Sequence, residues 1–261
     1  MATISLHPAV RERSKAQLSA NQLAEYVVYG IDRAHTIVHD AKFVQAFIPS
    51  WYDDSQRAVV DYLTDPLRNK QAIYDEIDRL AKVVASAESA DVRDRANLDV
   101  AVLEQFLRIE NQLGLKSLGF LKPPGRCAPL LIEKVLVSVQ PDVLVHPLVV
   151  AGTKSVGAVI FRFSKGVDPE SARKEATREK RREERREMGR YVAVLASMLL
   201  EKQFAHLGEV SPKHCIAIDI PLGEAIPLPG DRNKRTLRLK KACTQIAQTW
   251  PNVDPKPGIC A

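Results

Sequence analysis

The sequence predicts an α/β protein with a helical N-terminal region followed by a mixed sheet flanked by helices. Apolar residues recur at helical spacing up to about residue 113. The segment KPPGRCAP, residues 122–129, cannot continue a helix because of its prolines and glycine. Short β-branched runs and a long charged helix come after it. We therefore expect a helical region, residues 1–115, packed on an α/β core, residues 116–261, as one structural unit.

Composition sets limits on the class of protein. The chain has 261 residues, 45% of them hydrophobic, which suffices for a buried core. Its formal net charge of +6 favours polyanions such as DNA or RNA as partners. Its four cysteines are too far apart in sequence for a zinc knuckle or a redox motif, so we expect reduced thiols. No apolar run is long enough for a signal peptide or a membrane span, which predicts a cytoplasmic protein.

The helical region divides at turn signals. Ser19 is a good N-cap for a helix over residues 21–41. Helical spacing resumes from Asp53 and stops near Pro66. Two further helices are expected over residues 70–84 and 92–113.

The core begins with three expected strands in a meander, over residues 131–140, 143–150 and 156–163, each rich in β-branched side chains. A helix from about Ser171 to Phe204 follows, charged in its first half and apolar in its second. A strand over residues 214–220 then leads to a basic helix from Arg232 to Thr249.

Functional side chains fall at defined places in this order. Glu104, or less well Glu110, lies on the helix before the strands, and Pro141-Asp142 begins the second strand. Glu187 and Tyr191 are four residues apart on the long helix. This order of elements and residues resembles the core of PD-(D/E)XK nucleases, specifically the RecB-like branch, from roughly Glu104 to Trp250. The resemblance implies a restriction-endonuclease-like core.

Members of that family hold Mg²⁺ or Mn²⁺ with carboxylates, and a lysine orients the attacking water. By this resemblance Asp142 and Glu104 are the metal ligands. The catalytic set adds Glu187 in place of the family's glutamine, Tyr191, and either Arg162 or Lys165 in place of the lysine. The acid of the family's acid-x-Lys motif then falls on Ile160 or Phe163, neither of which binds a metal. Cleavage would need a migrated carboxylate, such as Glu187 or Glu183.

Two basic segments are candidates for nucleic-acid binding. The first, residues 173–190, pairs its glutamates with arginines three residues later, so we expect it largely to neutralise itself. The second contains no acid between its cations and is the stronger candidate. Its members are Arg232, Lys234, Arg235, Arg238, Lys240 and Lys241.

Three functions follow from these patterns. The first is a nuclease-fold protein that binds DNA or RNA with weak or absent cleavage of phosphodiester bonds. The second is an active Mg²⁺- or Mn²⁺-dependent nuclease that uses a migrated carboxylate. The third is a protein-interaction module on a nuclease-derived scaffold, forming a homodimer or binding a protein partner through its N-terminal helices.

Overall fold

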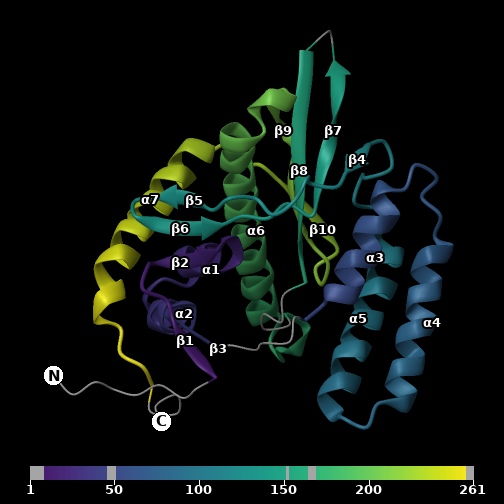
Figure 1. Ribbon diagram of the computed structural model, residues 1–261, viewed down its shortest axis with the longest axis horizontal. Coiled ribbons are helices and arrows are strands. Elements are labelled where there is room, and N and C mark those ends of the chain that lie inside the picture. The colour runs from purple at the N-terminus through teal and green to yellow at the C-terminus, as the bar shows by residue number, and fades with distance from the viewer. Residues whose placement is uncertain (1–8, 46–50, 151–152, 164–168, 257–261) are drawn as a thin grey trace. The chain divides into compact units, whose positions relative to one another are not determined.

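The computed structural model of the protein describes residues 9–45, 51–150, 153–163 and 169–256 (Figure 1). The chain forms two compact units, each assembled from separate segments. Unit 1 comprises Met1–Pro49, Cys127–Gln140 and Gly230–Ala261. Unit 2 comprises Ser50–Arg126 and Pro141–Pro229.

Unit 2 is an α/β unit with a five-stranded mixed sheet in the order β4-β7-β8-β9-β10. Strands β8 and β9 are parallel, and the other neighbouring pairs are antiparallel. The strands are β4 (Phe120–Leu121), β7 (Val143–Val150), β8 (Thr153–Arg162), β9 (Glu209–Asp219) and β10 (Glu224–Pro227). The helices are α3 (Asp53–Thr64), α4 (Gln71–Ser86), α5 (Ala90–Ile109) and α6 (Glu175–Gln203), with short 3-10 turns at Pro169–Ser171 and Ala205–Leu207.

Alternation along β8 divides its side chains between the two faces of the sheet. Val159 and Phe161 belong to the hydrophobic core shared with α3, α4 and α5. Arg162 lies on the opposite face, where it contacts Arg185 and Met188 of α6. The apolar second half of α6 is buried, as its composition predicts.

Unit 1 contains a three-stranded sheet in the order β2-β6-β5 and a separate two-stranded pair, β1-β3. Strand β2 runs parallel to β6, and β5 antiparallel to it. The strands are β1 (Val10–Glu12), β2 (Gln17–Ser19), β3 (Phe43–Gln45), β5 (Leu130–Ile132) and β6 (Val135–Ser138). The helices are α1 (Ala20–Tyr29), α2 (Ile31–Lys42) and α7 (Arg232–Thr249), followed by a 3-10 turn at Trp250–Asn252.

Ser19 caps α1 as the sequence predicts. Its hydroxyl accepts from the Gln22 N–H at 3.2 Å, and the Gln22 side chain accepts from the Ser19 N–H at 2.9 Å. The predicted single helix over residues 21–41 is wrong, however, because it breaks at Gly30. That residue has φ +56°, a conformation that favours glycine and separates α1 from α2.

The predicted three-strand meander is also wrong in its first strand. Residues 131–140 do not join the sheet of β7 and β8. They instead contribute to the hairpin of β5 and β6, which belongs to unit 1. Its turn uses Glu133 and Lys134, both at positive φ, a turn that lacks the usual Asn or Gly signal. In unit 2 the short strand β4 pairs with β7 instead. Region 1–115, expected to be helical, also contains the short strands β1, β2 and β3.

None of the helices in the described part of the chain is long and apolar enough to span a membrane.

Candidate functional site

Asp142 precedes β7, and neutral donors hold its carboxylate. Its Oδ2 accepts from the Phe161 N–H at 2.6 Å, and its Oδ1 accepts from the Gln56 side chain of α3. Its own N–H donates to the Val159 carbonyl at 2.9 Å. Burial raises the pKa of Asp142 to about 6, although these hydrogen bonds oppose the rise. Burial therefore dominates the pKa of this carboxyl group, and no cation is among the causes of the pKa shift.

A second buried acid, Asp99 of α5, binds Ser55, the residue that precedes Gln56. Its Oδ1 accepts from the Ser55 hydroxyl at 2.6 Å and from the Ser55 N–H at 2.9 Å. Asp99 and Ser55 are both buried. Asp99 and Asp142 thus bind two consecutive residues in the first turn of α3. The contact between Asp99 and Ser55 helps to hold the next residue, Gln56, against Asp142.

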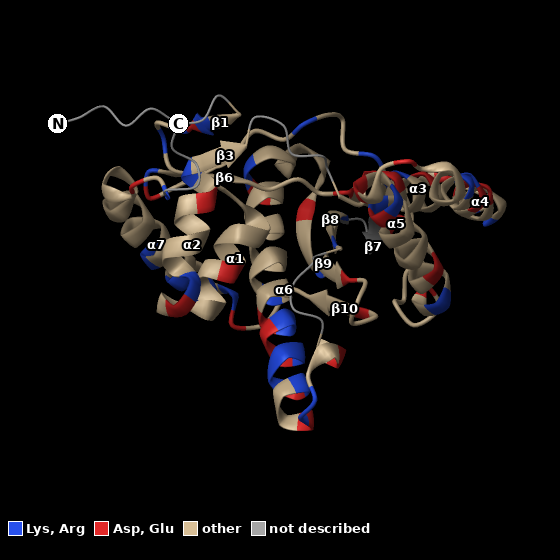
Figure 2. Ribbon diagram, turned by 90° about the horizontal axis from the view of Figure 1, so that it is seen from below, with Lys and Arg blue, Asp and Glu red and all other residues tan. Residues whose placement is uncertain are grey.

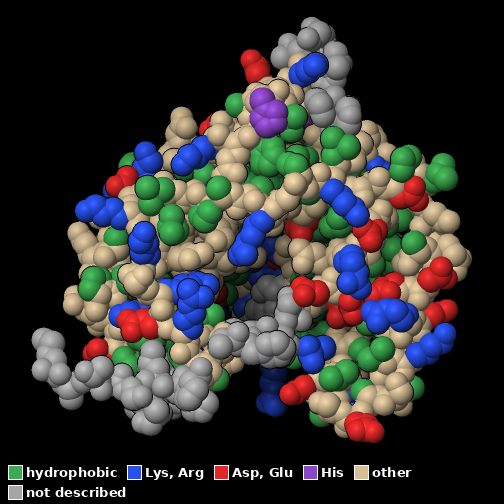
Figure 3. Space-filling model, in the orientation of Figure 1, with side chains coloured by type: hydrophobic (Ala, Val, Ile, Leu, Met, Phe, Trp, Pro, Cys, Tyr) green, Lys and Arg blue, Asp and Glu red, His purple; other side chains and the backbone are tan. Residues whose placement is uncertain are grey.

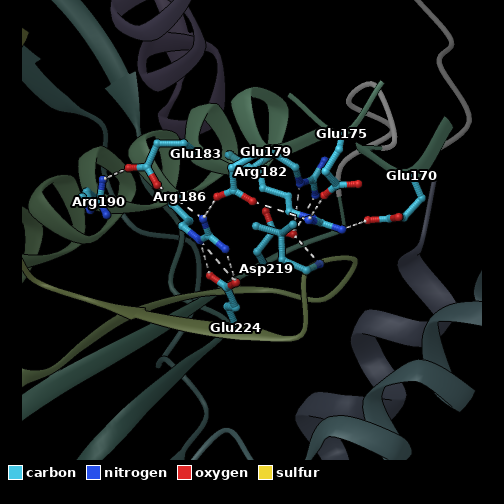
Figure 4. A network of polar contacts seen from close by, with 11 residues as sticks. Glu170, Glu175, Glu179, Arg182, Glu183, Arg186, Arg190, Asp219 and Glu224 are labelled. Carbon is cyan, nitrogen blue, oxygen red and sulfur yellow. Dashed lines mark hydrogen bonds and ion pairs between the residues drawn. The ribbon is translucent and has the colours of Figure 1, made fainter. Parts of the chain in front are cut away.

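A buried ion-pair network joins β8, β9 and α6 (Figure 4). Arg162 Nη1 lies 3.1 Å from Asp219 Oδ2, and Arg185 Nη2 lies 2.7 Å from Asp219 Oδ1. Arg162 Nη1 also donates to the Arg185 carbonyl at 2.7 Å. All three side chains are at most 3% exposed. Two guanidinium groups from different elements thus share the Asp219 carboxylate.

Basic and acidic residues are interspersed along the charged first half of α6 (Figure 2), and their side chains form a ladder of ion pairs (Figure 4). Arg182, Arg186 and Arg190 each bind the glutamate three residues earlier and the one seven residues earlier. Arg186 also reaches Glu224 of β10 at 2.9 Å, which raises the pKa of Arg186. The ladder confirms the predicted i,i+3 pairs at these positions, and these three arginines are therefore engaged by glutamates.

The structure does not place the other predicted catalytic residues against Asp142. Glu104 is exposed on α5, and Glu187 binds Arg190 at 2.9 Å. Tyr191 is buried in the apolar part of α6. Lys165 lies outside the described residues. Arg162, predicted as one alternative for the lysine position, binds Asp219 as described above.

The two remaining acids considered from the sequence also have basic partners. Glu183 binds Arg190 at 2.6 Å. Glu110 is buried, accepts from the Tyr62 hydroxyl and lies 2.6 Å from Lys70 Nζ. Burial, followed by the bond to Glu110, raises the pKa of Tyr62 to about 12. Among the described residues, no group of three or more His, Cys, Asp or Glu side chains could hold a metal ion.

Helix α7 keeps most of the predicted basic surface. Lys234, Arg238, Lys240 and Lys241 are exposed, and Arg232 is half-buried. Arg235 is buried instead, and its Nε lies 2.7 Å from Asp231 Oδ1. The structure therefore removes Arg235 from the predicted set, because its side chain is buried and pairs with Asp231. The other cations are left on the outer side.

The surface of α3 to α5 is of a different kind. Figure 3 shows acidic and basic side chains intermingled over these helices. Arg79 Nη2 lies 2.7 Å from both Asp54 and Glu76, and Arg57 binds the same two acids. The two acids balance the two arginines, so this cluster carries no excess positive charge for a polyanion.

Sequence reasoning missed Asp219, Arg185, Gln56 and Asp99. One signal was available for Asp219, an acid at the end of the apolar strand CIAID, because a charge in a buried strand requires a partner. No local pattern identifies Gln56 or Asp99, which reach the site through helix packing. Comparison of the chain with protein-family models, with curated proteins and with solved structures found no match. The function must therefore be argued from the residues themselves.

Proposed function

We propose that the chain is a nuclease-fold protein that binds nucleic acid and has weak or absent phosphodiester cleavage. The proposal has three parts: a restriction-endonuclease-like arrangement of unit 2, a catalytic position occupied by a buried ion pair, and a basic helix for the phosphate backbone. Each part rests on different residues.

Support for the fold comes from the order of elements in unit 2. Helix α5 precedes the antiparallel strands β4, β7 and β8; α6 follows, and β9 then runs parallel to β8. This is the order of helix, three strands, helix and strand that carries the PD-(D/E)XK resemblance. With β4 as the first strand, Asp142 stands at the start of the second, where the family has its Pro-Asp pair.

The observation that carries the loss of cleavage is the ion pair between Arg162 and Asp219. Where acid-x-Lys would stand on the third strand, the chain has Ile160 and Arg162, and both are buried. Arg162 is only 2% exposed and is bound to both the Asp219 carboxylate and the Arg185 carbonyl, so turning it toward a substrate would break both of these buried contacts. We expect its role to be structural.

The described residues do not fit a Mg²⁺ or Mn²⁺ site. Both oxygens of Asp142 accept hydrogen bonds, and the predicted second ligand, Glu104, is exposed. A single carboxylate supplies too little charge and too few oxygen ligands for either ion. The proposed function therefore contains no metal-dependent step. No specific observation favours the active nuclease over the binding protein.

The protein-interaction alternative has little support. In the described part of region 1–115, the exposed large apolar side chains are Ile31, Leu67, Tyr74 and Val92. Ile31, Tyr74 and Val92 lie on three different helices and Leu67 lies in the turn after α3, and single exposed apolar residues are normal on soluble proteins.

Support for binding comes from α7, whose eighteen residues contain no acid and whose Lys234, Arg238, Lys240 and Lys241 are exposed. Fluorescence polarisation with labelled DNA and RNA, titrated at low and at physiological salt, tests the proposal. We expect affinity that falls steeply with salt, because bound cations release counterions from the phosphates. An absence of binding to every nucleic acid at low salt would overturn it.

Cleavage is tested separately with supercoiled plasmid and with single-stranded DNA and RNA, in Mg²⁺ and in Mn²⁺. Asp142→Asn serves as the control because it keeps the size of the side chain. We expect the wild type and this variant to show the same background level of cleavage. Metal-dependent cleavage that Asp142→Asn abolishes would establish the active nuclease instead.

A further inference from the structure

We propose that α7 is a recognition helix for double-stranded DNA and that it binds in the major groove. The inference rests on the proposed function, because it names the ligand of the same basic helix. It goes further by choosing one nucleic acid and one groove.

The first argument is the shape of the exposed part of α7. Its buried side is formed by Arg235, Leu239, Ala242, Cys243 and Ile246, which recur at helical spacing. The rest of the helix is accessible along its whole length, from Asn233 to Thr249. Eighteen residues make a rod about 27 Å long, and the major groove of B-form DNA, about 12 Å wide, admits one α-helix.

The second argument is the order of side chains along that exposed side. Lys234, Arg238 and Lys241 are spaced by four and three residues, so they share one face of the first half of the helix. Thr244, Gln245 and Gln248 continue the exposed side in its last turns. Lysine and arginine bind phosphates or guanine, glutamine pairs with adenine, and a threonine methyl contacts thymine. The exposed side thus carries cations at one end and neutral base-reading groups at the other.

The third argument is the direction of the helix dipole. The N-terminus of a helix is the positive end, and acids there are favourable while cations are not. The N-cap residue, Asp231, is paired with Arg235, and the first turn of α7 contains no further acid, whereas its first three residues include Arg232 and Lys234. A bound phosphate offsets this repulsion, which gives the placement of cations at this end a physical reason.

Other nucleic acids fit less well. Proteins that bind single strands rely on aromatic side chains for stacking, and α7 has none; Trp250, directly after it, is buried. Leu237, 54% exposed between Lys234 and Arg238, is the large apolar side chain on this side of the helix. Double-stranded RNA has a deep, narrow major groove that side chains cannot read. Duplex DNA is the remaining ligand.

The experiment compares four labelled 30-nucleotide probes at one salt concentration: a DNA duplex, the RNA duplex of the same sequence, one DNA strand alone, and the DNA duplex with glucosylated hydroxymethylcytosine. The glucose groups fill the major groove and leave the phosphates in place. We expect the plain DNA duplex to bind about tenfold or more tightly than each of the other three.

A variant and a charge-matched control identify the helix. Lys234→Ala/Arg238→Ala/Lys241→Ala removes three cations from α7, and Lys82→Ala/Lys202→Ala/Lys213→Ala removes three exposed cations from unit 2. With the DNA duplex, we expect the α7 variant to lower the salt slope by about 3, or roughly one for each lost phosphate contact. The control variant should keep a slope close to that of the wild type.

Equal affinity for the glucosylated duplex or for the single strand would overturn the inference, as would equal effects of the two triple variants. In each of those results the chain still binds nucleic acid and the proposed function stands. If none of the four probes binds, the proposed function itself fails. Circular dichroism of both triple variants confirms that each is folded.

Discussion

Arg162 and Asp219 lie directly opposite each other on the parallel strands β8 and β9, with Arg162 Nη1 3.1 Å from Asp219 Oδ2. Register alone brings the two residues together, and α6 then adds Arg185 to the same carboxylate. The network is buried, so breaking it leaves charges that water cannot reach.

Asp219→Asn should therefore lower the free energy of unfolding by about 3–5 kcal/mol, because two buried guanidinium groups lose their counter-charge. Urea denaturation measures the change. Glu224→Gln is the control, since its pair with Arg186 is partly exposed and should contribute about 0–1 kcal/mol. If Asp219→Asn does not fold, Arg162→Met/Arg185→Met/Asp219→Leu should restore folding by removing all three charges. A loss below 1 kcal/mol for Asp219→Asn would contradict the structural role.

Asp142 should make stability depend on pH. Its folded pKa of about 6 lies above its ordinary value of 3.8, so the folded chain binds the proton more tightly than the unfolded chain. The contribution of Asp142 to the free energy of unfolding is therefore greatest below pH 4 and falls as pH rises to about 6, by roughly 3 kcal/mol in all.

Asp142→Asn should remove this dependence, because Asn stays neutral and Gln56 can turn its amide to match. We expect the variant to equal wild type near pH 4 and to exceed it in stability at pH 8, as measured by urea denaturation across the pH range. Asp61→Asn, at an exposed pair with Lys122, should show no comparable change. A wild type more stable than Asp142→Asn at pH 8 would show that the carboxylate has a charged partner.

Two glycines should respond differently to alanine. A Cβ at Gly157 of β8 would lie 2.4 Å from the main-chain oxygen of His214, beside the bulge between β8 and β9. A Cβ at Gly189 of α6 would instead lie 2.4 Å from Cδ1 at the end of the Ile226 side chain, with Cβ and Cγ2 of Ile226 at 3.3 Å. Gly157→Ala should cost about 1–3 kcal/mol or more. Gly189→Ala should cost less than Gly157→Ala, because a terminal methyl group can shift more easily than a main chain and helix propensity returns up to about 1 kcal/mol. Thermal unfolding separates the two; equal losses would contradict the close approach at Gly157.

Ser19→Ala should destabilise unit 1 by about 1 kcal/mol, because α1 loses the acceptor for its Gln22 N–H. Ser19→Asp keeps an acceptor and suits the positive end of the helix, so it should retain wild-type stability. Amide hydrogen exchange in the first turn of α1 reports the effect locally. Faster exchange in both variants would show that the hydroxyl itself, and not an acceptor, is required.

Local signals were sufficient for several elements. The predicted bounds of α7, Arg232 and Thr249, are confirmed, because Gly230-Asp231 precedes the helix and Trp250-Pro251 follows it. The position of Asp142 at the start of β7 was also readable from the Pro-Asp pair. Residues 131–140 were misread because they hold a hairpin whose turn, Glu133-Lys134, has no turn residue.

The candidate site was less predictable because its partners come from tertiary packing. Asp219 meets Arg162 through the parallel pairing of β8 and β9, and Gln56 meets Asp142 through the position of α3. Neither contact joins residues at a characteristic spacing in the sequence, so no sequence pattern predicts it. The exposure of Lys234 and Arg238 and the burial of Arg235 depend likewise on which side of α7 packs inward.

The segmented make-up of unit 1 has a consequence for folding during synthesis. Strand β2 pairs with β6, more than a hundred residues later in the chain, and α1 packs against α7, about two hundred residues later. The apolar side of α1 therefore waits until about two hundred further residues have been translated before its partner emerges from the ribosome. Both segments of unit 2 are complete by Pro229. We expect unit 2 to become protease-resistant first on the nascent chain, and unit 1 only after α7 is released.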